Sequence, residues 1–231
     1  MFERPHHQRI ALVLERIDAG LLRSHDCLFG GGTAIALARG EYRESVGIDF
    51  VCSTISGYRA MRELTSKSGI DWAFAQPLTV VRAPKADQYG IRCAVAVDDG
   101  TPIKIEIVYE GRVRLDPPLP EDRICGVWVC TRVDLAATKL MANTDRWADD
   151  SVMSRDLIDL AMLADSGEVP AAGVRKARRA YGSSIDEAFE KARRELQQRP
   201  GRLAVCMTNM GMRMSESALL ERIARLTLAS D

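Results

Sequence analysis

The chain has 231 residues, which is enough for one large domain or two small ones. Its 32 Lys and Arg residues balance its 32 Asp and Glu residues, so the net charge indicates no preference for a nucleic acid or an acidic partner. No apolar run is long enough to span a membrane, and the polar residues 1–9 do not resemble a secretory signal, which argues against a membrane or secreted protein.

The N-terminal segment is expected to form an amphipathic helix over residues 5–19. Its apolar residues recur at the spacing of a core-facing stripe, and they are Ile10, Val13, Leu14 and Ile17. His6 and His7 lie in the first turn of this helix and are expected to be solvated, because no third metal ligand is near them in the sequence. A short buried strand is expected next, at Cys27–Phe29.

Three consecutive glycines, Gly30 to Gly32, lead through Thr33 into an apolar helix at 34–38 and a strand at 45–50 that carries Asp49. Glycine permits a positive φ and a close approach of the backbone to a ligand. Thr33 can cap the helix, and the free N–H groups at a helix start suit a phosphate. Two interpretations stay open: a nucleotide cradle beside a metal-holding Asp49, or an ordinary glycine-rich turn with one surface carboxylate.

A second carboxylate is expected on a later strand. The elements expected after Asp49 are a helix at 58–67 and strands at 78–82, 91–97 and 103–108. In the last strand, isoleucines alternate with other residues, so Glu106 lies on the face opposite the isoleucines. Glu106 is then either solvent-facing or a second metal carboxylate beside Asp49.

The character of the chain changes after a proline-rich connector at 116–120 and a short strand at 127–129. Helices are expected from there on, at 132–147, 154–164, from 170, from 184, and at 216–228. The predicted fold is therefore a mixed α/β domain over residues 1–130, followed by a helical bundle over residues 131–231.

The cysteines indicate the redox environment. The six cysteines are Cys27, Cys52, Cys93, Cys125, Cys130 and Cys206. Their spacing contains neither a CxxC pair nor a pattern of zinc ligands. Several lie inside apolar runs, so we expect buried, reduced thiols in a cytoplasmic protein.

Four segments together carry a resemblance to a known family. Gly31-Gly32-Thr33, followed by Ser45-Val46-Gly47-Ile48-Asp49-Phe50, resembles the glycine-rich motif and the metal strand of the nucleotidyltransferase superfamily. Asp134–Ala142 and Ser154–Leu160 are similar to the two helical motifs of the AbiEii/AbiGii family of nucleotidyltransferase toxins. The resemblance covers roughly residues 25–165.

The resemblance implies a nucleotidyltransferase-like mixed sheet, Mg²⁺ as cofactor and a nucleoside triphosphate as substrate. It implies transfer of a nucleotide to a hydroxyl of RNA or protein, with tRNA 3′ ends as acceptor in some relatives. Members of the family are usually toxins paired with a separately encoded antitoxin protein.

The resemblance also implies roles for particular residues. The implied catalytic residues are Asp49, Glu106, Lys139 and Asp159. The implied nucleotide-binding residues are Gly31, Gly32, Thr33, Lys139, Arg155 and Asp156, and the implied metal ligands are Asp49 and Glu106. The alternatives are a snorkelling surface lysine at position 139, helix N-terminal carboxylates at 156 and 159, and a surface ion pair at Arg155.

One position departs from the family pattern. The family strand carries Asp-x-Asp, and here Gly47 stands where the first carboxylate is expected, on the same strand face as Asp49. The protein is therefore either a nucleotidyltransferase that works despite Gly47, or a degenerate relative that binds nucleotide, RNA or a partner without transfer. A third hypothesis is an interaction protein that retains only the fold.

Two runs of basic residues could contact an RNA backbone, although such runs are more often solvated helix faces. The first is Arg175, Lys176, Arg178 and Arg179, and the second is Lys191, Arg193 and Arg194.

Overall fold

The computed structural model describes residues 2–97 and 100–229. The chain divides into two compact units, and the first consists of Met1–Ala38 and Ser45–Thr131. The second consists of Arg39–Glu44 and Arg132–Asp231, so a short segment from the first half of the chain groups with the C-terminal half.

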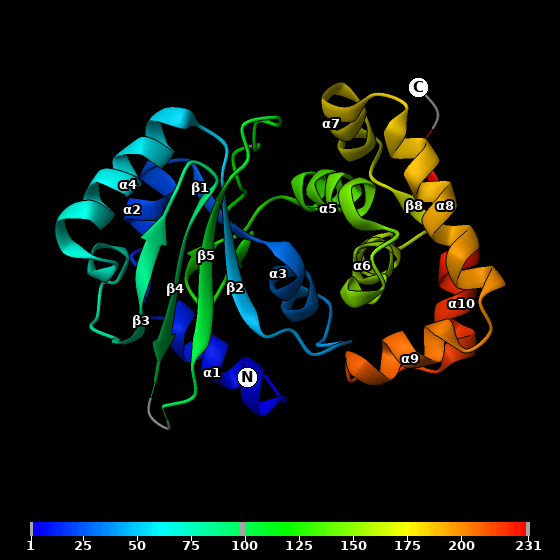
Figure 1. Ribbon diagram of the computed structural model, residues 1–231, viewed down its shortest axis with the longest axis horizontal. Helices are drawn as coiled ribbons and strands as arrows, with labels where there is room; N and C mark the ends of the chain where they lie inside the picture. The colour runs from blue at the N-terminus through cyan, green and yellow to red at the C-terminus, as the bar shows by residue number, and fades with distance from the viewer. Residues whose placement is uncertain (1, 98–99, 230–231) are drawn as a thin grey trace. The chain divides into compact units, whose positions relative to one another are not determined.

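The first unit is built on a five-stranded mixed sheet with the order β1-β2-β5-β4-β3 (Figure 1). Its strands are β1 (Cys27–Gly30), β2 (Gly47–Cys52), β3 (Thr79–Ala86), β4 (Gly90–Ala96) and β5 (Ile103–Tyr109). Strands β2 and β5 are parallel, and the other neighbouring pairs are antiparallel. The predicted mixed α/β sheet is confirmed.

Four helices belong to this unit: α1 (Pro5–Leu14), α2 (Ala19–Ser24), α3 (Gly31–Ala38) and α4 (Ile55–Ser68). A short ribbon of β6 (Arg123–Ile124) and β7 (Val127–Trp128) follows the sheet. The single helix expected at 5–19 is wrong, because the chain breaks after α1. Asp18 caps α2 by accepting a hydrogen bond from the Leu21 N–H at 2.8 Å, and such a cap favours a new helix start.

The largest buried side chains of β2 and β5 lie on one face of the sheet. The isoleucines of β5 and their in-register neighbours Ile48 and Phe50 on β2 are buried, as the period-two pattern predicts. The rings of Phe29 and Phe50 lie 5.7 Å apart, and Tyr58 of α4 stacks on Tyr109 of β5 at 5.3 Å. The opposite face of β2 and β5 carries the polar residues together with Val51 and Val108.

The second unit is helical, which confirms the predicted C-terminal bundle. Its helices are α5 (Arg132–Arg146), α6 (Arg155–Leu163), α7 (Ala171–Tyr181), α8 (Ser184–Gln198), α9 (Arg202–Asn209) and α10 (Glu216–Arg225). Helix α9 was not expected from the sequence. Two-residue strands β8 (Glu168–Val169) and β9 (Thr227–Leu228) pair in parallel.

Helix α5 is the centre of this bundle and contacts α6, α7 and α8. A glycine allows the closest of these approaches. A Cβ added at Gly173 of α7 would lie 2.7 Å from the carbonyl oxygen of Val133 and 3.0 Å from Cβ of Ala136. Any larger residue would push α7 away from α5.

All six cysteines are free, and all except the partly exposed Cys125 are buried, as expected. Within the described residues, the helices are too short or too polar to cross a membrane.

Candidate functional site

The glycine turn and Asp49 meet in the first unit. Strands β1 and β2 pair Gly30 with Asp49, which places the turn after β1 beside the Asp49 side chain. Gly31 has φ of 67°, and a Cβ added to it would lie 2.6 Å from Oδ2 of Asp49. Only glycine fits here, because both the backbone conformation and the space exclude a side chain.

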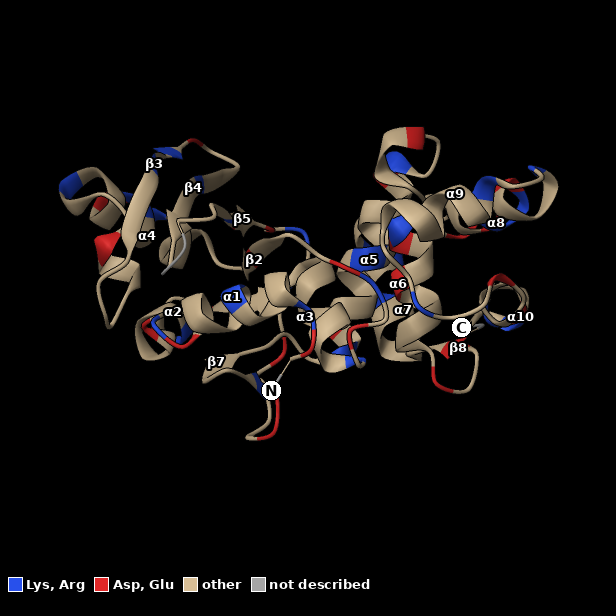
Figure 2. Ribbon diagram, turned by 90° about the horizontal axis from the view of Figure 1, so that it is seen from below, with Lys and Arg blue, Asp and Glu red and all other residues tan. Residues whose placement is uncertain are grey.

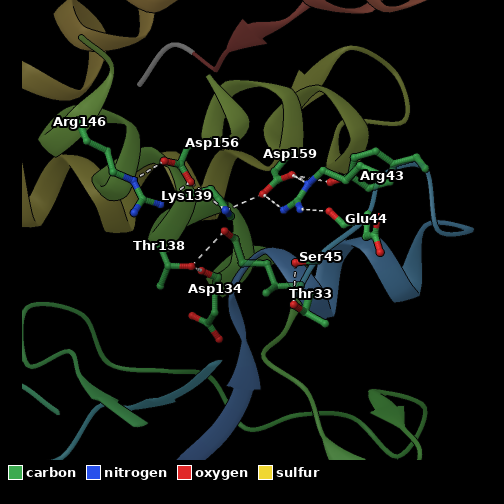
Figure 3. Close-up of polar contacts among 12 residues, drawn as sticks. Thr33, Arg43, Glu44, Ser45, Asp134, Thr138, Lys139, Arg146, Asp156 and Asp159 are labelled. Carbon is green, nitrogen blue, oxygen red and sulfur yellow. Dashed lines mark hydrogen bonds and ion pairs between the residues drawn. The ribbon is translucent and has the colours of Figure 1, made fainter. Parts of the chain in front are cut away.

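Thr33 ties the start of α3 to the start of β2. It lies inside the first turn of α3, so the expected capping role is wrong. Its hydroxyl donates to the carbonyl oxygen of Gly47 and lies 2.7 Å from Oγ of Ser45 (Figure 3). These bonds hold the backbone that leads into Asp49.

His7 supports the same segment. It is fully buried, and its Nε2 accepts a hydrogen bond from the backbone N–H of Ser45 at 3.0 Å. The expectation of a solvated His7 is wrong, because an unpaired N–H at Ser45 would be costly to bury and the ring supplies its acceptor.

Position 47 has room for a side chain. A Cβ at Gly47 would lie 3.5 Å from the carbonyl oxygen and 3.9 Å from Cβ of Lys104, both ordinary contacts, and its φ is not positive. The missing carboxylate is therefore a feature of this sequence and is not imposed by the fold.

Glu106 is the in-register neighbour of Asp49 on the adjacent strand β5. Paired residues share a face of the sheet, so the expectation that the two carboxylates lie side by side is confirmed. However, Glu106 Oε1 accepts from Arg92 Nε at 2.6 Å, and Oε2 accepts from Lys104 Nζ at 2.5 Å. Partial burial disfavours its ionised form, but the bonds from Lys104 and Arg92 outweigh burial and lower the pKa of Glu106.

The side chains at positions 47, 49 and 106 do not fit the ligand set of a two-ion magnesium centre. Two-metal phosphoryl transfer requires carboxylates that bridge ions about 3.5–4 Å apart. Here Gly47 offers no ligand, and both oxygens of Glu106 are held by cations. Within residues 2–97 and 100–229, no group of three or more His, Cys, Asp or Glu residues is arranged to hold a metal ion.

The other predicted residues lie in the second unit, where Lys139 of α5 is held between two carboxylates of α6. Its Nζ lies 2.8 Å from Oδ1 of Asp156 and 2.5 Å from Oδ2 of Asp159 (Figure 3). The Lys139 side chain is only 7% exposed, and both aspartates are buried. The snorkelling alternative is therefore wrong. Asp156 lies in the first turn of α6, as the alternative of a helix N-terminal carboxylate expects, and it is also paired with Lys139.

Residues from the 39–44 segment complete this cluster. The Arg43 guanidinium donates to Asp159 from Nε at 2.7 Å and from Nη2 at 2.9 Å, and the Tyr42 hydroxyl donates to Asp159 at 2.5 Å. Arg146 donates to Asp156 from Nε at 2.6 Å. Sequence reasoning missed these three partners. Tyr42 and Arg43 lie more than 100 residues from Asp159 in the chain, and nothing local marks such a contact, whereas Arg146 lies ten residues from Asp156.

The electrostatics follow from burial and pairing. Burial opposes the charge on Asp159, but Arg43 and Lys139 outweigh burial and lower its pKa. Lys139 and Arg146 likewise lower the pKa of Asp156 against the effect of burial. Burial, followed by the neighbouring Asp159 charge, raises the pKa of Tyr42, so its hydroxyl stays a donor. We define the ion cluster as Tyr42, Arg43, Lys139, Arg146, Asp156 and Asp159.

Arg155 differs from these residues. It is the exposed first residue of α6, and the preceding Ser154 has φ of 49° with no capping bond from its side chain. A nucleotide-binding role for Arg155 stays a prediction.

The class these features define is a nucleotidyltransferase-like protein, with a glycine turn beside a strand aspartate on a mixed sheet and a helical unit after it. Residues 13–217 match the family described as "Nucleotidyl transferase AbiEii toxin, Type IV TA system". The chain belongs to this family.

One solved structure supports the fold. The chain is similar to the crystal structure of JHP933 from Helicobacter pylori, with a TM-score of 0.50 and 16% identity over 97% of this chain and 90% of that one. A second H. pylori crystal structure, described as a candidate nucleotidyltransferase, has a TM-score of 0.49 and 17% identity over 95% of this chain and 89% of that one. Among curated proteins no match is found.

Proposed function

We propose that this chain is a toxin that binds a nucleoside triphosphate at the Gly31–Asp49 corner and transfers its nucleotide to an RNA hydroxyl slowly. The observation that carries the proposal is the close approach of Gly31 to the Asp49 carboxylate, where an added Cβ would lie 2.6 Å from Oδ2. Because α3 begins at Gly31, this approach brings the N–H groups at the start of the helix close to a carboxylate. The first bind phosphate, and the second can accept a proton.

In the transfer, the acceptor hydroxyl oxygen forms a bond to the α-phosphorus and pyrophosphate leaves with the electrons of the broken P–O bond. The hydroxyl proton has to go to a base, and we assign Asp49. Glu106 is a poorer base, because Lys104 and Arg92 stabilise its ionised form.

Slow transfer is expected because positioning and charge stabilisation supply most of the rate in phosphoryl transfer. The absent carboxylate at Gly47 removes part of both. The second candidate is a relative that binds nucleotide without transfer, and the two ion pairs on Glu106 favour it. The family implies an antitoxin partner, and a cytoplasmic site of action would supply both RNA and nucleoside triphosphates.

The test is incorporation of labelled nucleotides into total RNA, with nucleotide binding measured by calorimetry in parallel. We expect slow incorporation by the wild type, a loss of about 100-fold or more in Asp49→Asn, and a gain in Gly47→Asp. Asp71→Asn is the matched control, because Asp71 is an exposed carboxylate of the same unit. Fast wild-type transfer that is indifferent to Asp49→Asn would refute the assignment. Nucleotide binding without any transfer would select the second candidate.

A further inference from the structure

The polar face of the sheet carries rows of charged residues that run from Asp49 to the edge strand. One row pairs Asp49 with Glu106, Glu106 with Arg92, and Arg92 with Lys85. We define the charged face as this row together with the row of Gly47, Lys104, Ala94 and Arg82. Register partners share a face, so Asp49, Glu106, Arg92 and Lys104 lie on one side of the sheet. Arg82 and Lys85 are the partners of Ala94 and Arg92 in β3, whose register shifts between the two residues.

The charge on this face is uneven. The two carboxylates lie on β2 and β5, and beyond Glu106 the described face carries Arg92, Arg82 and Lys85. Strands lie about 4.8 Å apart, so β4 is about 10 Å and β3 about 14 Å from the strand of Asp49. The cations on β4 and β3 are therefore too far from Asp49 to contact one phosphate group bound there, and they could contact further phosphates of a longer ligand.

The outermost cations are available to a ligand. Strand β3 is an edge strand whose residues are exposed along most of its length, and Arg82 and Lys85 are both exposed. Blue Lys and Arg segments lie on β3 in Figure 2. By contrast, Arg92 pairs with Glu106 and with Asp87.

The turn that follows these cations in the chain carries an exposed aromatic residue. Tyr89, in the turn between β3 and β4, is 65% exposed. Asp87 fixes this turn, since its Oδ1 accepts from the N–H groups of Tyr89 and Gly90 at 2.7 and 3.0 Å. An exposed aromatic ring and exposed cations on one hairpin are the two features that single-stranded nucleic acid uses, with stacking for the bases and cations for the phosphates.

We propose that single-stranded RNA lies across the charged face, with Arg82 and Lys85 contacting its phosphates and Tyr89 stacking on a base. This inference rests on the proposed function in one respect, because it gives a path for the RNA acceptor toward Asp49. It differs from the RNA surface expected on α7 and α8. There, Lys176 donates to Asp134, Arg178 donates to Asp186, and Arg193 donates to the Leu226 carbonyl oxygen.

The experiment measures binding of a fluorescently labelled 12-nucleotide single-stranded RNA to the full chain at several salt concentrations. In Arg82→Gln/Lys85→Gln, two phosphate contacts are lost. The slope of log K against log salt should then become shallower by about 1.4, and binding at 0.1 M salt should weaken by about 25-fold. Tyr89→Ala should weaken binding by about tenfold, and Tyr89→Phe should retain it.

The matched control is Arg175→Gln/Arg179→Gln, which removes two exposed arginines of α7. We expect its RNA affinity to stay within about twofold of the wild type. If this variant loses RNA binding and the β3 variant does not, the proposal is overturned. The proposal is also overturned if a polyglutamate peptide binds as tightly as the RNA and Tyr89→Ala has no effect, because the face would then fit an acidic protein.

Failure of the proposed function is separable from failure of this inference. Calorimetry of nucleoside triphosphate binding to the β3 variant should give the wild-type affinity, since neither substituted residue lies at the Gly31–Asp49 corner. RNA binding at β3 in a protein that binds no nucleotide would refute the proposed function and support the charged face.

Discussion

Removing the Asp159 carboxylate should destabilise the second unit strongly. Asp159 is fully buried, and its oxygens accept from Arg43, Tyr42 and Lys139. In Asp159→Asn the fold keeps the shape of the side chain, but Arg43 loses its carboxylate partner while it is only 5% exposed. Lys139 keeps Asp156, so the uncompensated charge is mainly that of Arg43.

The magnitude follows from this burial. Breaking a buried ion pair by removing one partner costs about 3–5 kcal/mol, because the other charge stays buried and unpaired. In Arg43→Met, Asp159 keeps Lys139 and Tyr42, and the loss should be smaller, about 1.5–3 kcal/mol for hydrogen bonds to a charged group. The double variant removes both charges, so its loss should be less than the sum of the two by about 1–3 kcal/mol.

Urea titrations of the wild type, the two single variants and the double variant, followed by far-UV circular dichroism, give the free energies of unfolding. Hydrogen exchange of α6 checks that the loss falls in the second unit. The control is Arg39→Met, which breaks an exposed pair of the same segment. Arg39 and Asp165 are 28% and 57% exposed, and such pairs contribute about 0–1 kcal/mol. Additivity of Arg43→Met and Asp159→Asn within about 0.5 kcal/mol would refute the pairing.

Three further outcomes are expected. The pKa values of Asp156 and Asp159 are lowered in the folded protein, so the stability these carboxylates contribute is present above pH ~4, the pKa in the unfolded chain, and is lost as the pH falls below it. Unfolding measured along an acid titration should show this loss of stability, and the loss should be smaller in Asp159→Asn. Gly31→Ala should cost about 1–2 kcal/mol for its positive φ, with a further loss from displacement of Asp49, measured by thermal unfolding. Gly47→Ala should instead be neutral or stabilise the protein by up to about 1 kcal/mol, because its backbone and surroundings accept a Cβ; equal losses in both variants would contradict this reasoning.

The glycine turn and the sheet could be predicted because their signals are local. Alternation along β5 fixed the face of Glu106, and the glycines marked the one backbone position that has a positive φ against Asp49. The break between α1 and α2 was missed because the apolar stripe continues to Ile17, and the cap at Asp18 is a weaker sequence signal than the stripe.

The ion cluster could not be predicted for a different reason. Lys139 lies among apolar residues of α5, which suits both a buried lysine and a snorkelling one, and periodicity does not distinguish them. The deciding partners are Arg43 and Asp159, which are 116 residues apart in the chain. Their pairing depends on tertiary packing that no local pattern encodes.

The departure at Gly47 and the pairing of Glu106 are connected through Lys104. Lys104 is the register partner of Gly47 and also donates to Glu106, two residues along the same strand face. A carboxylate at position 47 would lie beside this lysine and compete with Glu106 for it. With glycine at position 47, the ammonium group of Lys104 pairs with Glu106 instead. The absence of a carboxylate at position 47 therefore also makes Glu106 less available to a metal ion. We therefore expect Gly47→Asp to change the site in two ways at once, by adding a carboxylate on β2 and by weakening the hold of Lys104 on Glu106.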